Sequence, residues 1–416
     1  MVNIKKIEFS DYQKTLIFNY LATGANILTG LILFPLIVKY LGMKELAMFG
    51  IFYSIKAFID IGVGWLSASI TKNLIKYKYL KDTIFTFSIL WNFTYACIGS
   101  VLFILYGYFI KNEFLASSIM FGVFVFFSFL ILPFYEMLIS ELKQSIVAFF
   151  RFLQQFLFFI FSVSVFIFAD TKSLDSVFFI LFLSSAFVFI LIFIYYQKLY
   201  RLKIITKYIN RKLFNKLIFS DGRDLFINAV VIIALLQIDV LLIDYLYGSV
   251  SAATYLILWK VPNTIIMLGW RLSEPFQAII AKDFANKEKV LDRFTALEKK
   301  IFFVGLIAGI GYFIFGKLIL EFWMGKDNIP DIDYMYLVPS IVIFLSILQR
   351  LYMSINFYTK GLNTVTFFEL IELILKVIFT IFLFSMFNEL SPIVGWMIGL
   401  MITIYFYRKN SIKVFI

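Results

Sequence analysis

The sequence of 416 residues contains no histidine and a single cysteine, Cys97. A disulfide within the chain is therefore excluded, as are metal sites built from cysteine and histidine and catalysis that relies on an imidazole. Charged residues are also scarce. They make up 15% of the chain, against about 25% in an average soluble protein. These absences remove most classes of soluble enzyme before any motif is considered, and we expect neither an enzyme nor a metal or organic cofactor.

Apolar residues are abundant instead, at 62% of the chain, and 54 residues are phenylalanine. They form repeated runs of about 20 residues, the length that crosses a bilayer as a helix. The first such run is already long enough to span, so we expect no cleavable signal peptide. The pattern predicts an all-α integral membrane protein with twelve transmembrane helices, over residues 15–38, 47–70, 83–109, 116–139, 147–169, 176–197, 224–247, 251–278, 301–322, 337–358, 366–387 and 392–407.

The longest polar interval, Lys198–Arg223, carries eight lysine or arginine residues and separates two sets of six predicted helices. Cationic connectors of membrane proteins lie on the cytoplasmic side, and the remaining cations alternate accordingly, which places both termini in the cytoplasm. We predict an N-terminal lobe over 1–197, a cytoplasmic connector over 198–223 and a C-terminal lobe over 224–416. The net charge of +12 then reflects loops that face anionic lipids, and we expect no nucleic-acid binding because no motif supports it.

Several cations fall inside the predicted helices. An ionisable residue near the bilayer centre costs about 2.5–3.5 kcal/mol to insert, so it normally faces the interior of the bundle. At about 1.5 Å per residue, three lysines reach the midplane and one arginine lies slightly nearer the cytoplasm: Lys56, Lys260, Lys376 and Arg350.

Acidic residues accompany these cations. Asp60 follows Lys56 by one helical turn on the same face, and Glu369 and Glu372 share one stripe of a helix with Lys376. Asp239 lies in the outer half of the seventh predicted helix. Two interpretations are open: the charges pair with one another for structural reasons, or they line a polar central cavity between the lobes.

A cavity lined by lysine and arginine would bind an anion, because both side chains hold phosphate through charge-assisted hydrogen bonds. Polar residues on one face of the first helix, Asn19, Thr23, Asn26 and Gly30, either line the same cavity or join neighbouring helices. In the cavity interpretation Asn26 contributes to the substrate site, and Asp60, Asp239, Glu369 or Glu372 pairs with the cations or binds a coupling H⁺ or Na⁺.

The two halves show a faint internal repeat. Residues 40–65 and 245–270 each begin with Tyr-Leu and a glycine, enter an apolar helix, carry a lysine at similar depth and reach a tryptophan nine or ten residues later. This pattern predicts a parallel repeat of six helices.

The segment FNYLATGANILTGLILFPLIVKYLGMKELAMFGIFYSI, followed by IDIGVGWLSASITKNL, resembles the N-terminal signature of O-antigen (Wzx-type) flippases. These belong to the multidrug/oligosaccharidyl-lipid/polysaccharide exporter superfamily. The resemblance covers about residues 15–75 and rests on Pro35, the Tyr-Leu-Gly turn at 40–42, Phe49–Gly50, Asp60, Gly62 and Gly64.

The resemblance implies a fold like that of multidrug and toxin extrusion proteins, with two six-helix lobes around a central cavity. It also implies a function: alternating-access movement of undecaprenyl-pyrophosphate-linked O-antigen or polysaccharide repeat units across the bacterial inner membrane. The implied partners are the lipid-linked oligosaccharide, membrane lipids and polysaccharide polymerase machinery, and we expect a monomer. The site implied for the pyrophosphate is formed by Lys56, Lys260, Lys376 and Arg350, where many such flippases carry arginines.

Two other functions are considered. A cation-coupled exporter of small amphiphiles would bind cationic or neutral ligands through Asp60, Asp239 and Glu369. A membrane-embedded glycosyl- or phosphotransferase would need a catalytic loop outside the membrane, and the predicted external connectors are all short.

Overall fold

A computed structural model describes residues 4–169, 172–200, 204–205, 215, 223–272, 287–330 and 334–415. Within these ranges, side chains are described except at 4–12, 287–292, 358–359 and 412–415. Most of the predicted basic connector, and Lys282 of the next predicted cytoplasmic loop, lie outside the described residues.

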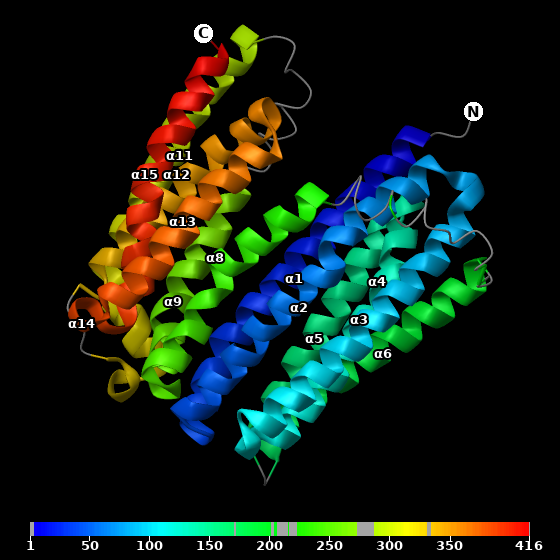
Figure 1. Ribbon diagram of the computed structural model, residues 1–416, viewed down its shortest axis with the longest axis horizontal. Helices are drawn as coiled ribbons and strands as arrows, with labels where there is room; N and C mark the ends of the chain where they lie inside the picture. Colours follow the sequence, from blue (N-terminus) through cyan, green and yellow to red (C-terminus); the bar gives the residue numbers. More distant parts are fainter. Residues whose placement is uncertain are drawn as a thin grey trace. The chain divides into compact units, whose positions relative to one another are not determined.

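The described residues form helices and no strand. They divide into two compact units, Met1–Phe226 and Ile227–Ile416. Unit 1 contains α1 (Ile4–Tyr40), α2 (Met43–Lys76), α3 (Lys81–Phe109), α4 (Leu115–Ser140), α5 (Gln144–Phe168) and α6 (Leu174–Tyr200). Unit 2 contains most of α8 (Arg223–Tyr247), then α9 (Ser249–Arg271), α11 (Lys287–Met324), α12 (Leu337–Lys360), α13 (Leu362–Phe382), the short α14 (Phe384–Phe387) and α15 (Ser391–Phe415) (Figure 1).

All twelve predicted transmembrane helices are present as helices, and the chain is a multi-pass membrane protein. Eleven of the described helices are long and apolar enough to cross a bilayer. The remaining predicted helix, α13, has 21 residues but carries three charged ones, Glu369, Glu372 and Lys376. All three are buried in unit 2, which is how a helix with these charges can cross an apolar layer.

The boundaries of several helices differ from the predictions. Helix α1 begins at Ile4 and α11 at Lys287, well before the apolar runs that identify them. The helix predicted over 251–278 ends at Arg271, and the one predicted over 366–387 ends at Phe382. A hydropathy pattern locates the part of a helix that lies in lipid, whereas backbone hydrogen bonds carry a helix on into the polar region.

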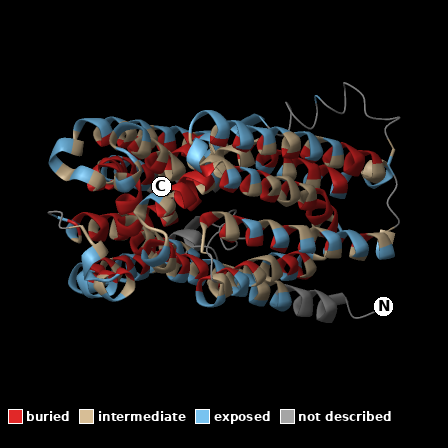
Figure 2. Ribbon diagram, turned by 90° about the horizontal axis from the view of Figure 1, so that it is seen from below, coloured by how far each residue is buried: buried red, intermediate tan, exposed pale blue. Residues whose placement is uncertain are grey.

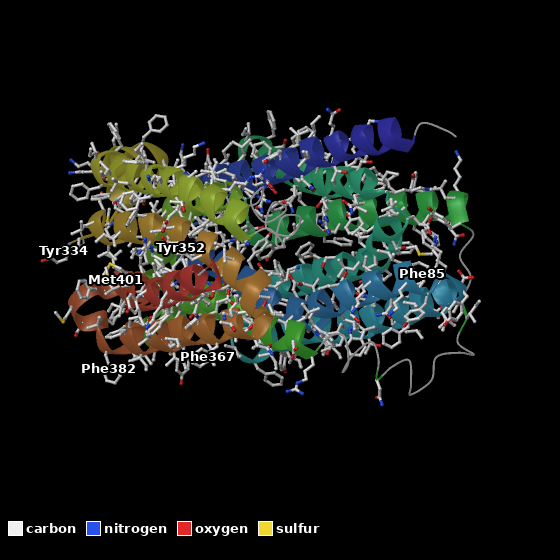
Figure 3. The ribbon with its side chains drawn as sticks, turned by 90° about the horizontal axis from the view of Figure 1, so that it is seen from above. Phe85, Tyr334, Tyr352, Phe367, Phe382 and Met401 are labelled. Atoms are coloured by element: carbon white, nitrogen blue, oxygen red, sulfur yellow. The ribbon has the colours of Figure 1, made fainter. Side chains whose placement is uncertain are left out.

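Buried residues lie between the helices within each unit (Figure 2). Many large apolar residues are nevertheless exposed. In unit 1 the core is aromatic: the ring of Phe121 contacts those of Phe52, Phe103 and Phe178 at centroid distances of 4.8–5.4 Å. In unit 2, Phe367 and Phe382 project outward from α13, as expected of side chains that meet lipid (Figure 3).

The packing of the helices repeats in part between the two units. In unit 1, α4 packs against α2, α3 and α6; in unit 2, α12 packs in the same way against α9, α11 and α15. The contact of α5 with α6 is likewise repeated by α13 and α15. Helices α2 and α9 both follow a glycine, Gly42 and Gly248, whose φ angles of 118° and 91° disfavour any other residue. Lys56 and Lys260 therefore lie on equivalent helices.

The close contact of α13 with α15 depends on two glycines spaced by four residues, Gly395 and Gly399. A Cβ added at Gly395 would lie 2.8 Å from the carbonyl oxygen of Lys376, and one at Gly399 would lie 3.1 Å from Cα of Glu372. Small residues at this spacing let helix backbones approach within a membrane. They bring α15 against the stretch of α13 that carries the charges.

We therefore expect Gly395→Ala to destabilise unit 2 by about 1–3 kcal/mol, the usual cost of overpacking a filled core. The matched control is Gly311→Ala in α11, where an added Cβ would meet nothing within 4 Å. Thermal unfolding of the detergent-solubilised protein measures both. A Gly395→Ala protein as stable as the Gly311→Ala protein would contradict the packing described here.

Candidate functional site

The charged residues predicted inside the helices are found in two groups, one in each unit. In unit 1, Lys56 and Asp60 lie one turn apart on α2, and the Lys56 Nζ is 2.8 and 2.7 Å from the two carboxylate oxygens of Asp60. The predicted pairing of these residues is confirmed. The ammonium also lies over the rings of Phe124 and Phe129 of α4, at 5.6 and 5.7 Å from their centroids.

The pair is only partly buried, with side-chain exposures of 16% for Lys56 and 37% for Asp60. The two aromatic faces favour the cation, and the carboxylate neutralises it. As it stands, the pair has no net charge, so it attracts an anion weakly. An anion would compete with Asp60 for the ammonium group of Lys56.

In unit 2, Lys376 of α13 pairs with Asp239 of α8, with 2.5 Å between Nζ and Oδ2 and with both side chains 2% exposed. The ammonium also donates to the backbone oxygen of Leu235, at 2.6 Å, and lies 5.1 Å from the ring centroid of Trp396. The hydroxyl of Tyr255 on α9 donates to Asp239 at 2.5 Å. These contacts join α8, α9, α13 and α15 inside one unit.

Glu372 lies one turn before Lys376 and is held by hydrogen bonds from uncharged groups. Thr403 Oγ1 and Trp396 Nε1 donate to it at 2.6 and 3.2 Å, and Gln349 Nε2 donates as well. The sequence suggests four acids, Asp60, Asp239, Glu369 and Glu372, as partners of the cations. The direct partner of Lys376 is Asp239, because α8 passes beside the lysine and supplies both a carboxylate and a carbonyl oxygen.

Glu369 and Arg350 form the third part of the group in unit 2. Glu369 accepts a hydrogen bond from Asn228 Nδ2 at 3.1 Å and interacts electrostatically with Arg350. The guanidinium of Arg350 lies 5.2 Å from the ring centroid of Trp270, whose indole donates to the backbone oxygen of Ser346. Glu369 is buried, whereas Arg350 is half-buried.

The remaining predicted site residues are less enclosed. Lys260 on α9 is half-buried, and its neighbour Trp259 contacts Trp396 with 5.5 Å between ring centroids. Asn26 on α1 is exposed. The structure thus separates sealed charges, at Lys376, Asp239, Glu369 and Glu372, from accessible ones, at Lys56, Asp60, Lys260 and Arg350.

Two polar residues of these networks, Tyr255 and Thr403, are not indicated by the sequence pattern. Glu136 of α4 is 1% exposed and was overlooked although it lies within the predicted span 116–139. An acidic residue within an apolar run is the sequence feature that points to this position.

No protein-family model and no curated protein sequence matches this chain. Solved structures match over nearly its whole length. The lipid II flippase MurJ in an inward closed conformation has a TM-score of 0.70 at 15% identity, covering 96% of this chain and 89% of the other. An inward-facing multidrug resistance MATE family transporter of the MOP superfamily has a TM-score of 0.68 at 12% identity, covering 96% and 98%.

A MOP superfamily transporter from Pyrococcus furiosus, described by the reversed polarity of its binding pocket, has a TM-score of 0.63 at 13% identity and covers 97% of this chain and 96% of the other. At these identities the likeness shows the fold. The chain has the fold of MOP superfamily transporters, which drug exporters and a lipid flippase share.

If the Lys376–Asp239 pair is a structural element of unit 2, removing one of the two charges should lower the stability of the fold far more than removing both. We expect Lys376→Met to destabilise the protein by about 3–5 kcal/mol, the cost of leaving a buried charge unpaired. The double variant Asp239→Asn/Lys376→Met should recover a large part of that loss. Thermal unfolding of the purified proteins measures both effects.

The control is Lys44→Ala, which breaks an exposed pair with Glu113 and should cost at most about 1 kcal/mol. A double variant as unstable as Lys376→Met alone would show that the two charges do not compensate each other.

Proposed function

We propose that this protein is a flippase that moves undecaprenyl-pyrophosphate-linked O-antigen or polysaccharide repeat units by alternating access. Transport would run from the cytoplasmic to the periplasmic leaflet of the bacterial inner membrane. The observation that carries the proposal is the pair of half-buried lysines, Lys56 and Lys260, deep within the equivalent helices α2 and α9. The fold shared with a lipid II flippase and with exporters supports transport as the general activity.

The chemistry of the cargo explains why cations would be needed. A polyprenyl tail is soluble in the bilayer and a glycan can be hydrated, but a diphosphate pays a large desolvation cost in an apolar layer. Ammonium and guanidinium groups offset that cost by direct hydrogen bonds. Lys56, Lys260 and Arg350 are the half-buried cations that would supply them, whereas Lys376 is enclosed with Asp239 in this conformation.

The contact between Lys56 and Asp60 suggests how transport could be coupled to an ion. Phosphate and Asp60 compete for the same ammonium. Asp60 would hold Lys56 while no cargo is bound, and it would be the site at which a coupling H⁺ or Na⁺ binds. Under this proposal Asp60 is the coupling residue of unit 1, and the flipped product passes to polysaccharide polymerase machinery.

A second candidate function is the cation-coupled export of small amphiphiles. Asp60 favours it, because its side chain is more exposed than that of Lys56 and an exposed acid would attract a cationic ligand. The two functions differ in the charge of the cargo, which the following experiment varies.

In proteoliposomes, we expect the wild-type protein to move a fluorescent polyprenyl-diphosphate oligosaccharide between leaflets. The double variant Lys56→Ala/Lys260→Ala should lose at least about tenfold in rate, which corresponds to about 1.4 kcal/mol. Accessibility of the fluorophore to a membrane-impermeant quencher reports the rate.

Lys44→Ala, which removes an exposed lysine from the same helix α2, is the control and should flip the lipid at the wild-type rate. Undiminished flipping by the Lys56/Lys260 double variant would reject these residues as ligands. A wild-type protein that moves cationic dyes and leaves the diphosphate lipid in place would favour the exporter instead.

Asp60→Asn tests the competition. In Asp60→Asn the competing charge is gone, so affinity for the diphosphate lipid should exceed that of the wild-type protein at the same pH. Titration of the purified protein with the lipid, followed by tryptophan fluorescence, measures this affinity, and an Asp60→Asn protein with wild-type affinity would contradict the competition.

A further inference from the structure

The proposed function does not use the buried carboxyl group of Glu136, which lies on α4 in unit 1. Its side chain is 1% exposed, and it forms no salt bridge within the described part of the chain. One oxygen, Oε2, accepts a hydrogen bond from Ser88 Oγ of α3. The other, Oε1, is buried and has no hydrogen-bond partner among the described residues.

A second unsatisfied oxygen belongs to the same network. Asn92 of α3, 1% exposed, donates from Nδ2 to the backbone oxygen of Ser88 at 2.9 Å and to Ser88 Oγ at 3.3 Å. Its Oδ1 is buried and accepts no hydrogen bond from a described residue. The hydrogen-bond network of Asn92, Ser88 and Glu136 therefore contains two buried acceptor oxygens for which no donor is described.

The helices around Glu136 bring no compensating charge to it. Helix α2 supplies the hydroxyl of Ser67, and α3 supplies Ser88 and, at its cytoplasmic start, Lys81, which pairs with Glu141. From α5, the guanidinium of Arg151 lies over the ring of Tyr135, 5.3 Å from its centroid. Helix α6 contributes Tyr196, whose ring stacks on that of Phe85.

A carboxylate in such a place would be an uncompensated charge, which costs several kcal/mol or more in an apolar interior. Binding one proton removes the charge, so the neutral carboxylic acid is the form that suits this enclosed position.

We propose that Glu136 is a proton-binding site within unit 1, held protonated in the closed packing of α2, α3 and α4 described here. The proton is released only when water reaches the carboxyl. The protonation of Glu136 is argued from the geometry of unit 1 alone, whereas a use of this proton in transport rests on the proposed function.

Infrared spectroscopy of the purified full chain, without substrate, tests this directly. A protonated carboxyl group has a C=O stretching band that a carboxylate lacks. Near neutral pH, the wild-type spectrum minus the Glu136→Gln spectrum should contain such a band. Ser88→Ala should keep the band and shift its frequency, because the hydrogen bond to Oε2 is lost.

Glu113→Gln is the matched control. Glu113 lies in the turn before α4, is half exposed and pairs with Lys44 at 2.6 Å, so its substitution should leave the protonated-carboxyl band unchanged. A wild-type spectrum equal to that of Glu136→Gln in this region would show that Glu136 is ionised and would overturn the proposal. Loss of the band on adding NaCl at constant pH would identify a sodium site and overturn it as well.

Because no lipid is present, the result is independent of the flippase assignment. The band can be found in a protein that moves no diphosphate lipid, and it can be missing from one that does.

Discussion

A charged side chain inside a bilayer persists only beside a partner, and this constraint shapes both units of the protein. The cost of an unpaired ion in an apolar medium exceeds most single packing interactions. Two cations in the central parts of the helices, Lys56 and Lys376, have a described carboxylate partner, and in both cases the partner belongs to the same unit. Lys56 has Asp60 and two aromatic rings, and Lys376 has Asp239 and a backbone carbonyl. The second of these ion pairs also joins two helices, because Asp239 lies on α8 and Lys376 lies on α13.

Enclosure divides the charges into two kinds with different consequences. The pair of Lys376 with Asp239 and the carboxylate of Glu372 are sealed between helices and packed by Gly395 and Gly399, so they stabilise unit 2. Lys56 and Lys260 are half-buried on equivalent helices. The proposed flippase function depends on this second kind of charge.

The sequence predicted the helices well, because lipid imposes one strong rule, a continuous apolar run of about 20 residues. It also predicted the pair of Lys56 with Asp60, since residues four apart on one helix must be neighbours. It could not predict that Lys376 bonds Asp239, because that contact joins residues far apart in the chain and depends on which faces of α8 and α13 meet. Glu136 was missed for a related reason: one acid barely changes the hydropathy of a 26-residue helix, and its partners lie on other helices.

The central claim is that an anionic lipid diphosphate is held by ammonium groups within the helices. Mass spectrometry of lipids that copurify with the protein from cells producing lipid-linked glycans tests it most directly. The account predicts that the wild-type protein carries polyprenyl-diphosphate glycan and that Lys56→Ala/Lys260→Ala protein, folded and equally abundant, has lost most of it. Equal amounts of that lipid on both proteins, or a cationic amphiphile in its place, would contradict the account.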